Sequence, residues 1–371
     1  MHHAIAGTTF ETLLRIPGLS MPTRIVQGVH DAITQGVYAA VRHGGHAAFT
    51  LTGGLERHFD DPARIPGAKE QGFRSALNGA VGDSLAAAGS ALAVQMELRD
   101  RDGPATAATL ARLPERTCVF LHGLACDEHS WRLRHDAWNS TPSASAPPGN
   151  PPLSYGDLLE RDLGVGALWL RYNTGLAVEQ NAQLLAELLK RAAVAAPQVR
   201  EWVLIGHSMG GLVARSAQAL GQQSGLGWAV HVPMIVCLGS PHQGAPLAKL
   251  GHAAAAALAV SDVTKPLARI AEARSRGIKD LRHGLKGNAS SAPALRLVFG
   301  TLGDEGGTGL APLVGRWLGD GLVRAGSASA DDLAGDVQRV ELAGLGHMAL
   351  LNHPRVYNVI RRWIADAAPV G

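Results

Sequence analysis

The chain has 371 residues, of which 46% are hydrophobic and 18% are charged. This composition is that of a globular protein with a substantial core and excludes a disordered chain. The formal net charge of +3 is spread along the sequence rather than gathered into basic blocks, so no nucleic-acid footprint is visible.

The N-terminus lacks a basic start followed by an apolar segment, so no secretory signal is visible. The longest alanine-rich stretch, residues 253–260, is shorter than the roughly 20 residues that a membrane-spanning helix needs. We therefore expect a cytoplasmic protein. Its three cysteines form no spaced framework and are expected to be reduced thiols.

Residues 1–90 are predicted to form a helical extension. Ile25, Val29, Ile33 and Val37 recur every four residues, and a second amphipathic pattern covers residues 72–88. Two interpretations stay open. These helices either pack on the neighbouring domain or make peripheral contact with a membrane surface or a partner.

From about residue 91 to the C-terminus, short apolar runs alternate with helical segments. This rhythm predicts an α/β domain with a mostly parallel sheet and crossover helices. Strands are expected at residues 93–98, 117–121, 167–172, 202–205, 234–238, 294–299 and 338–342. Helices are expected at residues 176–195, 212–223 and 354–367.

Two stretches interrupt this alternation. Residues 139–154 are rich in serine and proline and predict an irregular loop. Residues 244–290 look helical and lie between two predicted strands, which favours a cap or lid over the site. The apolar cap residues Leu250, Leu258, Val260 and Leu267 favour a hydrophobic substrate, although the same residues would also serve to pack the cap.

The most informative segment is the run from Gly206 to Gly210, which contains Ser208 between an apolar strand and a helix-like stretch. In this context a G-x-S-x-G serine becomes a nucleophile exposed on a sharp turn. Side chains at Gly206 or Gly210 would collide where the strand and helix backbones approach. The neighbouring His207 is expected to shape the site, and the alternative is a helix-start serine.

A serine hydroxyl needs a histidine base, which a carboxylate orients. We expect His347 as the base because it follows a predicted strand and a flexible glycine pair. His353 is the second choice, although its place before Pro354 favours capping of the last helix. For the acid we expect Asp320, in Asp-Gly-Leu-Val, and keep Asp304 as the alternative because it also follows a strand closely.

The oxyanion formed in acyl transfer needs backbone N–H donors after the nucleophile and in the first strand-to-helix loop. These positions correspond to Met209 and Leu124, while His122 and Gly123 shape the loop.

Metal binding and a cysteine nucleophile are less well supported by the residues around this loop. His122, Asp127 and His129 do not match a strong zinc spacing, and this reaction requires no metal or other cofactor. Cys126 has no evident activating partner, so a wall position fits it better than a nucleophile.

Several of these segments together resemble the α/β-hydrolase superfamily, within it the lipase and esterase branch that includes lipase class 2 and inositol-deacylase-like hydrolases. The resemblance covers residues 93–371. Its carriers are His-Gly-Leu at 122–124, Gly-His-Ser-Met-Gly-Gly at 206–211, Gly-Ser-Pro-His-Gln-Gly at 239–244, Gly-Ile-Lys-Asp-Leu-Arg at 277–282, Gly-Asp-Gly-Leu-Val at 319–323 and Gly-His at 346–347. The resemblance implies carboxylic ester hydrolysis through an acyl-enzyme, and residues 1–90 match no general lipase element.

We therefore expect a serine esterase or lipase with a small or lipid-like hydrophobic ester as its partner. An acyltransferase or polyester depolymerase would use the same triad, and a non-catalytic, membrane-associated binding protein is a more distant alternative. The oligomeric state and the acyl chain length stay open.

Overall fold

A computed structural model describes residues 68–133, 138, 153–245, 275–284, 293–302 and 319–367. The first predicted N-terminal helix and Asp304 lie outside these ranges, as do most of the loop at residues 139–154 and most of the cap at residues 244–290, including its four apolar residues.

The described residues build a seven-stranded sheet with the order β1-β3-β2-β4-β5-β6-β7. Every neighbouring pair is parallel except β1 and β3, which are antiparallel. The strands are β1 (Glu97–Arg99), β2 (Arg116–Leu121), β3 (Gly166–Arg171), β4 (Glu201–His207), β5 (Met234–Leu238), β6 (Ala294–Thr301) and β7 (Val337–Ala343). The predicted mostly parallel sheet is confirmed.

Six of the seven predicted strands match the observed ones within two residues at either end, and the first is the exception. Residues 93–96 precede β1 rather than belong to it. Val94 donates its N–H to the side chain of Asn78 (2.9 Å), so this apolar segment packs against a helix instead of pairing with a strand. Hydrophobicity predicted its burial but not its partner.

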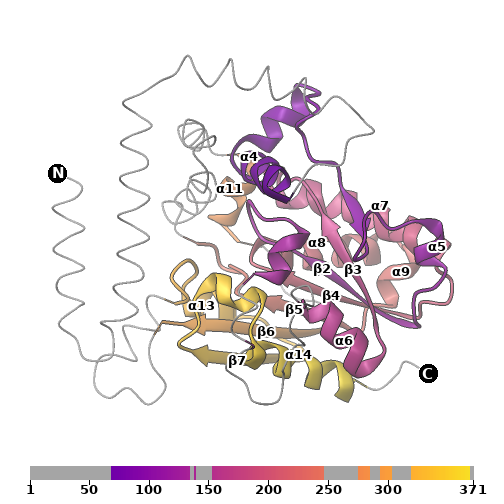
Figure 1. Cartoon of the computed structure of the whole chain (residues 1–371). Helices are drawn as coiled ribbons and strands as arrows, with labels where there is room; N and C mark the ends of the chain where they lie inside the picture. Colours follow the sequence, from indigo (N-terminus) through magenta and orange to yellow (C-terminus); the bar gives the residue numbers. More distant parts are fainter. Residues whose placement is uncertain are drawn as a thin grey trace, which may run out of the picture.

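Helices cover both faces of the sheet. They are α4 (Ala68–Ala87), α5 (Ala107–Leu110), η1 (Glu128–Arg132), α6 (Tyr155–Leu163), α7 (Val178–Ala195), α8 (Met209–Gln223), α9 (Gly227–Val230), α11 (Arg276–Leu281), α13 (Ala325–Ser329), η4 (His347–Leu351) and α14 (Pro354–Asp366). Figure 1 shows α6 and α14 on one side of the sheet, with α7, α8 and α9 on the other.

The strands alternate between two apolar cores because successive side chains of a strand point to opposite faces. On β2, Val119 and Leu121 join the core under α7 and α8, whereas Cys118 and Phe120 join the core under α6 and α14. Burial on both faces explains why these strands read as continuous apolar runs.

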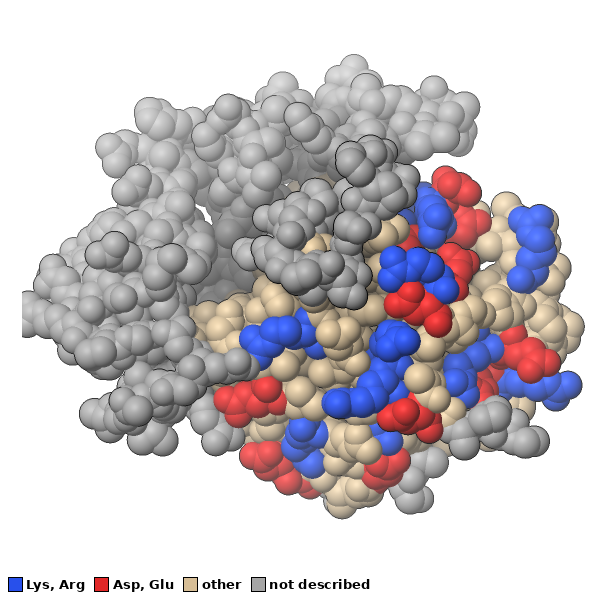
Figure 2. All heavy atoms as spheres, turned by 60° about the horizontal axis from the view of Figure 1, so that its bottom comes forward, with Lys and Arg blue, Asp and Glu red and all other residues tan. Residues whose placement is uncertain are grey.

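The surface that Figure 2 shows carries basic and acidic side chains interspersed over the described part of the face. Within the described ranges, every helix is either too short or too polar to cross a lipid bilayer.

Candidate active site

Ser208 lies in the turn that joins β4 to α8. Its backbone has φ 53° and ψ −121°, a conformation that non-glycine residues rarely adopt. Such backbone strain costs on the order of 1–3 kcal/mol and persists only where the surroundings fix it. The Ser208 N–H donates to the carbonyl of Leu238 at the end of β5 (2.8 Å), which ties the turn to the next strand.

The glycines around Ser208 lie where backbones almost touch. A Cβ at Gly206 would lie 2.3 Å from the nitrogen of Gly211, in the first turn of α8. A Cβ at Gly210 would lie 2.3 Å from the carbonyl oxygen of Leu121, at the end of β2. The strand and helix therefore approach each other as the sequence predicted, and the helix also approaches a second strand.

His347 and Asp320 form a buried hydrogen-bonded pair. The Nδ1–H of His347 donates to Oδ2 of Asp320 (2.7 Å), and both side chains are almost fully buried. Oδ1 of Asp320 accepts the N–H groups of Leu322 (3.1 Å) and Val323 (2.8 Å), so the carboxylate is held in place. With Nδ1 carrying the proton, Nε2 of His347 is left with the lone pair that a general base needs.

The loop of His347 is attached directly to the serine turn. Nε2–H of His207 donates to the carbonyl of His347 (3.0 Å), and the two rings lie 4.6 Å apart. Burial, and next the neighbouring His347, hold the pKa of His207 well below its ordinary value of 6.5. His207 is therefore neutral near pH 7 and acts as a structural donor, which fits its expected site-shaping place.

The loop at residues 123–127, called the β2 loop below, lies against the serine turn. A Cβ at Gly123 would lie 3.1 Å from Cβ of Ser208, so a side chain there would crowd Ser208. Leu124 follows Gly123 in this loop, and Met209 begins α8, where first-turn N–H groups have no intrahelical acceptor. Both expected oxyanion donors thus belong to backbone segments that flank Ser208.

His122 anchors the start of this loop. Its ring stacks on Tyr172 (4.5 Å between centroids), and its carbonyl accepts the Tyr172 hydroxyl (2.7 Å). Nδ1–H of His122 donates to the carbonyl of Gly123 (3.0 Å), and burial lowers the pKa of His122. The residue shapes the loop as a neutral ring.

The alternative residues have other roles or lie outside the described residues. Nδ1 of His353 accepts the N–H of Arg355 (3.1 Å), so His353 caps α14 as the sequence predicted. Burial raises the pKa of Cys126 to about 11, which keeps its thiol protonated. Asp304 lies outside the described residues, so the structure shows only Asp320 next to His347.

Among the described residues, Asp127, Glu128 and His129 bring ligand atoms within 4.8 Å of one another. Both carboxylates already have protein partners. Asp127 caps η1 by accepting the N–H of His129 (3.0 Å), and Glu128 pairs with Arg99 and Arg171. His122, which the sequence placed in this group, bonds to the Gly123 carbonyl instead.

Two further residues position the site, and the sequence analysis assigned neither of them a role of its own. Thr174 accepts the N–H of Ala125 through Oγ1 (3.0 Å) and so supports the β2 loop. Gly239 lies beside the acid and base, since a Cβ there would be 3.0 Å from Oδ2 of Asp320 and 3.2 Å from Nδ1 of His347. For Gly239, the Gly-Ser-Pro-His-Gln-Gly run that contains it is the sequence signal that indicates a place near the site.

The same run is joined to the loop of the acid. Oγ of Ser327 donates to the carbonyl of Gly244 (2.6 Å), and the N–H of His242 donates to the carbonyl of Ser327 (3.1 Å). These bonds fix the segment after β5 against the segment that carries Asp320.

Comparison with known proteins gives one family match. The family model described as PGAP1-like alpha/beta domain matches residues 171–276, a segment that includes β4, Ser208 and β5. No curated protein matches the chain.

Solved structures with distant likeness include lipases, esterases and thioesterases. The mature lipase BlEst2 of Bacillus licheniformis is 16% identical, with 73% of this chain and 98% of that chain covered and a TM-score of 0.43. A thermophilic esterase of Thermogutta terrifontis is 14% identical, with 73% and 93% covered and a TM-score of 0.41. YbtT, a type II thioesterase of yersiniabactin biosynthesis, is 14% identical, with 68% and 92% covered and a TM-score of 0.42.

The chain has the α/β-hydrolase fold that the sequence motifs predicted. The family match covers the segment of Ser208, and the strand order places that segment at the carboxyl end of the central strand β4. In this fold the nucleophile stands on such a strand-to-helix turn, followed in the chain by the acid and then the base. Ser208, Asp320 and His347 occur in that order.

Proposed function

We propose that this protein is a carboxylic ester hydrolase, an esterase or lipase that acts on a hydrophobic acyl ester through a covalent acyl-enzyme. The observation that carries the proposal is the buried hydrogen bond between His347 and Asp320 (2.7 Å), in a loop bonded to the strained turn of Ser208. A carboxylate-oriented histidine next to such a serine is the arrangement that activates a hydroxyl for acyl transfer.

In the first half of the reaction, Oγ of Ser208 attacks the ester carbonyl carbon while its proton passes to Nε2 of His347. The oxygen of the tetrahedral intermediate accepts hydrogen bonds from the N–H groups of Leu124 and Met209. Collapse breaks the bond to the alcohol oxygen, which takes the proton from His347 and leaves as the alcohol. Ser208 then carries the acyl group.

In the second half, water attacks the acyl carbon and gives its proton to His347. Collapse of the second tetrahedral intermediate returns that proton to Oγ of Ser208 and releases the carboxylic acid. Asp320 holds the imidazole in one tautomer throughout and stabilises the imidazolium that forms in each half. No redox partner or metal takes part in these steps.

Hydrolysis of p-nitrophenyl esters from acetate to palmitate tests the proposal. We expect turnover by the full chain and its loss in Ser208→Ala, with the preferred chain length separating an esterase from a lipase. Addition of an alcohol acceptor detects acyl transfer, the alternative reaction of the same acyl-enzyme. A folded protein that hydrolyses no ester of the series, or a Ser208→Ala variant that retains full activity, contradicts the proposal.

A further inference from the structure

Helix α4 belongs to the described part of the N-terminal region, and it packs against the loops that follow β2 and β3. A Cβ at Gly79 of α4 would lie 2.7 Å from Cβ of Ala125 and 2.8 Å from its Cα. Ala125 belongs to the β2 loop, immediately after the proposed oxyanion donor Leu124. Since these atoms are so close, the helix backbone itself is the wall that limits where this loop can lie.

The contact coincides with a strained backbone. Ala125 has φ 61°, in the left-handed region that a β-carbon disfavours. Its N–H donates to Oγ1 of the buried Thr174 (3.0 Å), in the loop that follows β3. The peptide that joins Leu124 to Ala125 is therefore bonded to Thr174, and Ala125 also lies against Gly79 of α4.

A kink in α4 provides the carbonyl groups to which the start of α11 is bonded. Val81 has non-helical φ −140° and ψ 19°, which interrupts the helix and frees carbonyl groups just before it. Ser275 takes two of them, because its Oγ donates to the Gly79 carbonyl (2.7 Å) and its N–H donates to the Ala80 carbonyl (3.0 Å). The start of α11 is thus bonded to α4 at the position that touches the β2 loop.

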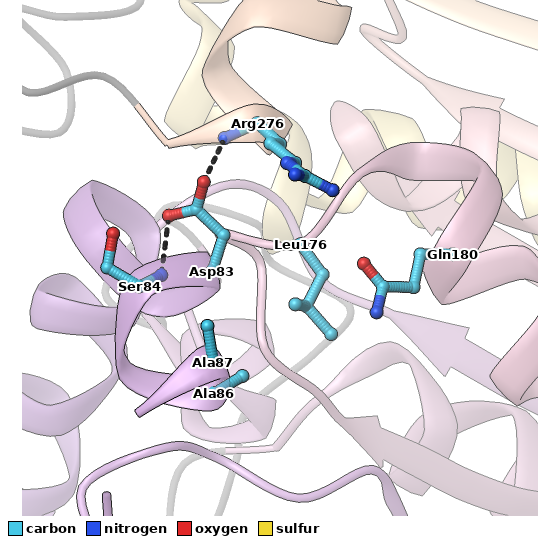
Figure 3. Close-up of a pocket in the computed structure, with 7 residues that line it drawn as sticks. All are labelled: Asp83, Ser84, Ala86, Ala87, Leu176, Gln180 and Arg276. Atoms are coloured by element: carbon cyan, nitrogen blue, oxygen red, sulfur yellow. Dashed lines mark hydrogen bonds between the residues drawn. The ribbon is translucent and has the colours of Figure 1, made fainter. Parts of the chain in front are cut away.

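The loop after β3 contacts the β2 loop, α4 and α11. Nδ2 of Asn173 donates to the carbonyl of Gly82 on α4 (2.8 Å), and a Cβ at Gly277 of α11 would lie 2.2 Å from the carbonyl oxygen of Thr174. Figure 3 shows Asp83 of α4 bonded to the backbone of Arg276, beside a surface hollow that Leu176 and Gln180 also line.

We infer that α4 is a positioning element of the catalytic site, which holds the Leu124 N–H in place through Gly79 and Thr174. This inference rests on the proposed ester hydrolysis. Its consequence is that a residue in the N-terminal region, remote from every hydrolase motif, affects the transition state. An oxyanion donor acts only on the charge that develops there, so its displacement lowers kcat and leaves KM nearly unchanged.

Two glycines of α4 provide a matched test in the full chain. Gly79→Ala pushes against the Ala125 backbone, whereas a Cβ at Gly72 on the same helix meets no heavy atom of the described residues within 4 Å. Both changes replace a helical glycine by alanine, so their effects on helix propensity are similar. We expect Gly79→Ala to lower kcat for a p-nitrophenyl ester by about 10- to 100-fold with little change in KM, and Gly72→Ala to leave kcat unchanged.

A second pair covers the case in which Gly79→Ala does not fold. Thr174→Val removes the acceptor of the Ala125 N–H with little change in volume, whereas Thr174→Ser keeps a hydroxyl. We expect Thr174→Val to lower kcat and Thr174→Ser to recover most of the loss. Amide hydrogen exchange in residues 121–127 is expected to become faster in Gly79→Ala and Thr174→Val only.

Equal kcat values for Gly79→Ala and Gly72→Ala overturn the inference, even if exchange in the loop becomes faster. A parallel loss of kcat, substrate affinity and melting temperature without recovery in Thr174→Ser also overturns it, because that pattern indicates general damage. Absence of ester turnover in the unchanged chain instead refutes the proposed function, and the positioning role falls with it.

Discussion

The proposed acid Asp320 and base His347 follow β6 and β7, which are neighbours in the sheet. Hydrogen bonds from Leu322 and Val323 hold the Asp320 carboxylate, and these partners lie within three residues of it. The oxyanion side of the site is held differently. The β2 loop depends on α4, α11 and the loop after β3, whose bonded residues lie up to 196 positions apart in the chain. The Asp320 carboxylate is therefore fixed by short-range contacts, whereas the β2 loop is fixed by long-range packing.

Replacement of the acid is expected to have the largest effect and tests the short-range side. Asp320→Asn keeps the shape but removes the charge that orients His347, so we expect ester turnover to fall by about 10³- to 10⁴-fold. Asp304→Asn is the matched control and should retain activity. Steady-state kinetics on one activated ester measure both, and the reverse result would assign the acid to Asp304.

Crowding of the serine turn should have the next largest effect. A Cβ at Gly206 meets backbone atoms of Gly210 and Gly211 at 2.4 and 2.3 Å, so Gly206→Ala must separate β4 from α8. We expect a loss of about 3 kcal/mol or more in the free energy of unfolding, measured by denaturant titration.

The control for that change is Gly227→Ala in α9, where an added Cβ meets no heavy atom within 4 Å. We expect it to leave the stability unchanged or slightly raised, because alanine favours helix. If Gly206→Ala leaves the free energy of unfolding as high as Gly227→Ala does, β4 and α8 separate at little cost and the expectation is wrong.

The pH dependence of stability gives the smallest effect and concerns His207, which joins the turn of Ser208 to the loop of His347. Burial, and next the neighbouring His347, hold the pKa of His207 well below 6.5. As the pH falls below 6.5, His207 therefore stays neutral in the folded protein while it binds a proton in the unfolded chain. Stability therefore falls as pH drops below about 6.5, with a slope of about 1.4 kcal/mol per pH unit for each such group.

His207→Gln should reduce this slope by that amount between pH 6 and pH 5, as measured from unfolding curves at several pH values. The buried His122 and His242 have lowered pKa values as well and should retain the rest of the slope. An identical slope in the variant would mean that His207 is protonated in the folded state.

Sequence patterns alone were enough to predict the sheet and the turn of Ser208. Strands such as β2 and β5 are continuous apolar runs because both faces are buried, and the glycines around Ser208 are required where backbones meet. These features are local, so period, spacing and residue type were sufficient to predict them. The hydrogen bond between Asp320 and His347 joins residues 27 positions apart and agrees with the expectation from the Asp-Gly-Leu-Val motif, while Asp304 lies outside the described residues.

The contacts that hold the β2 loop became visible in the folded molecule and not in the sequence. Nothing in the pattern of residues 72–88 indicated whether the helix would cover a core, a membrane or a partner, since an amphipathic pattern does not identify what its apolar face contacts. The helix kinks at Val81, Ser275 bonds the freed carbonyls, and Gly79 then rests on Ala125. Such contacts join segments far apart in the chain, and they depend on shape and backbone approach, which a one-dimensional pattern does not record.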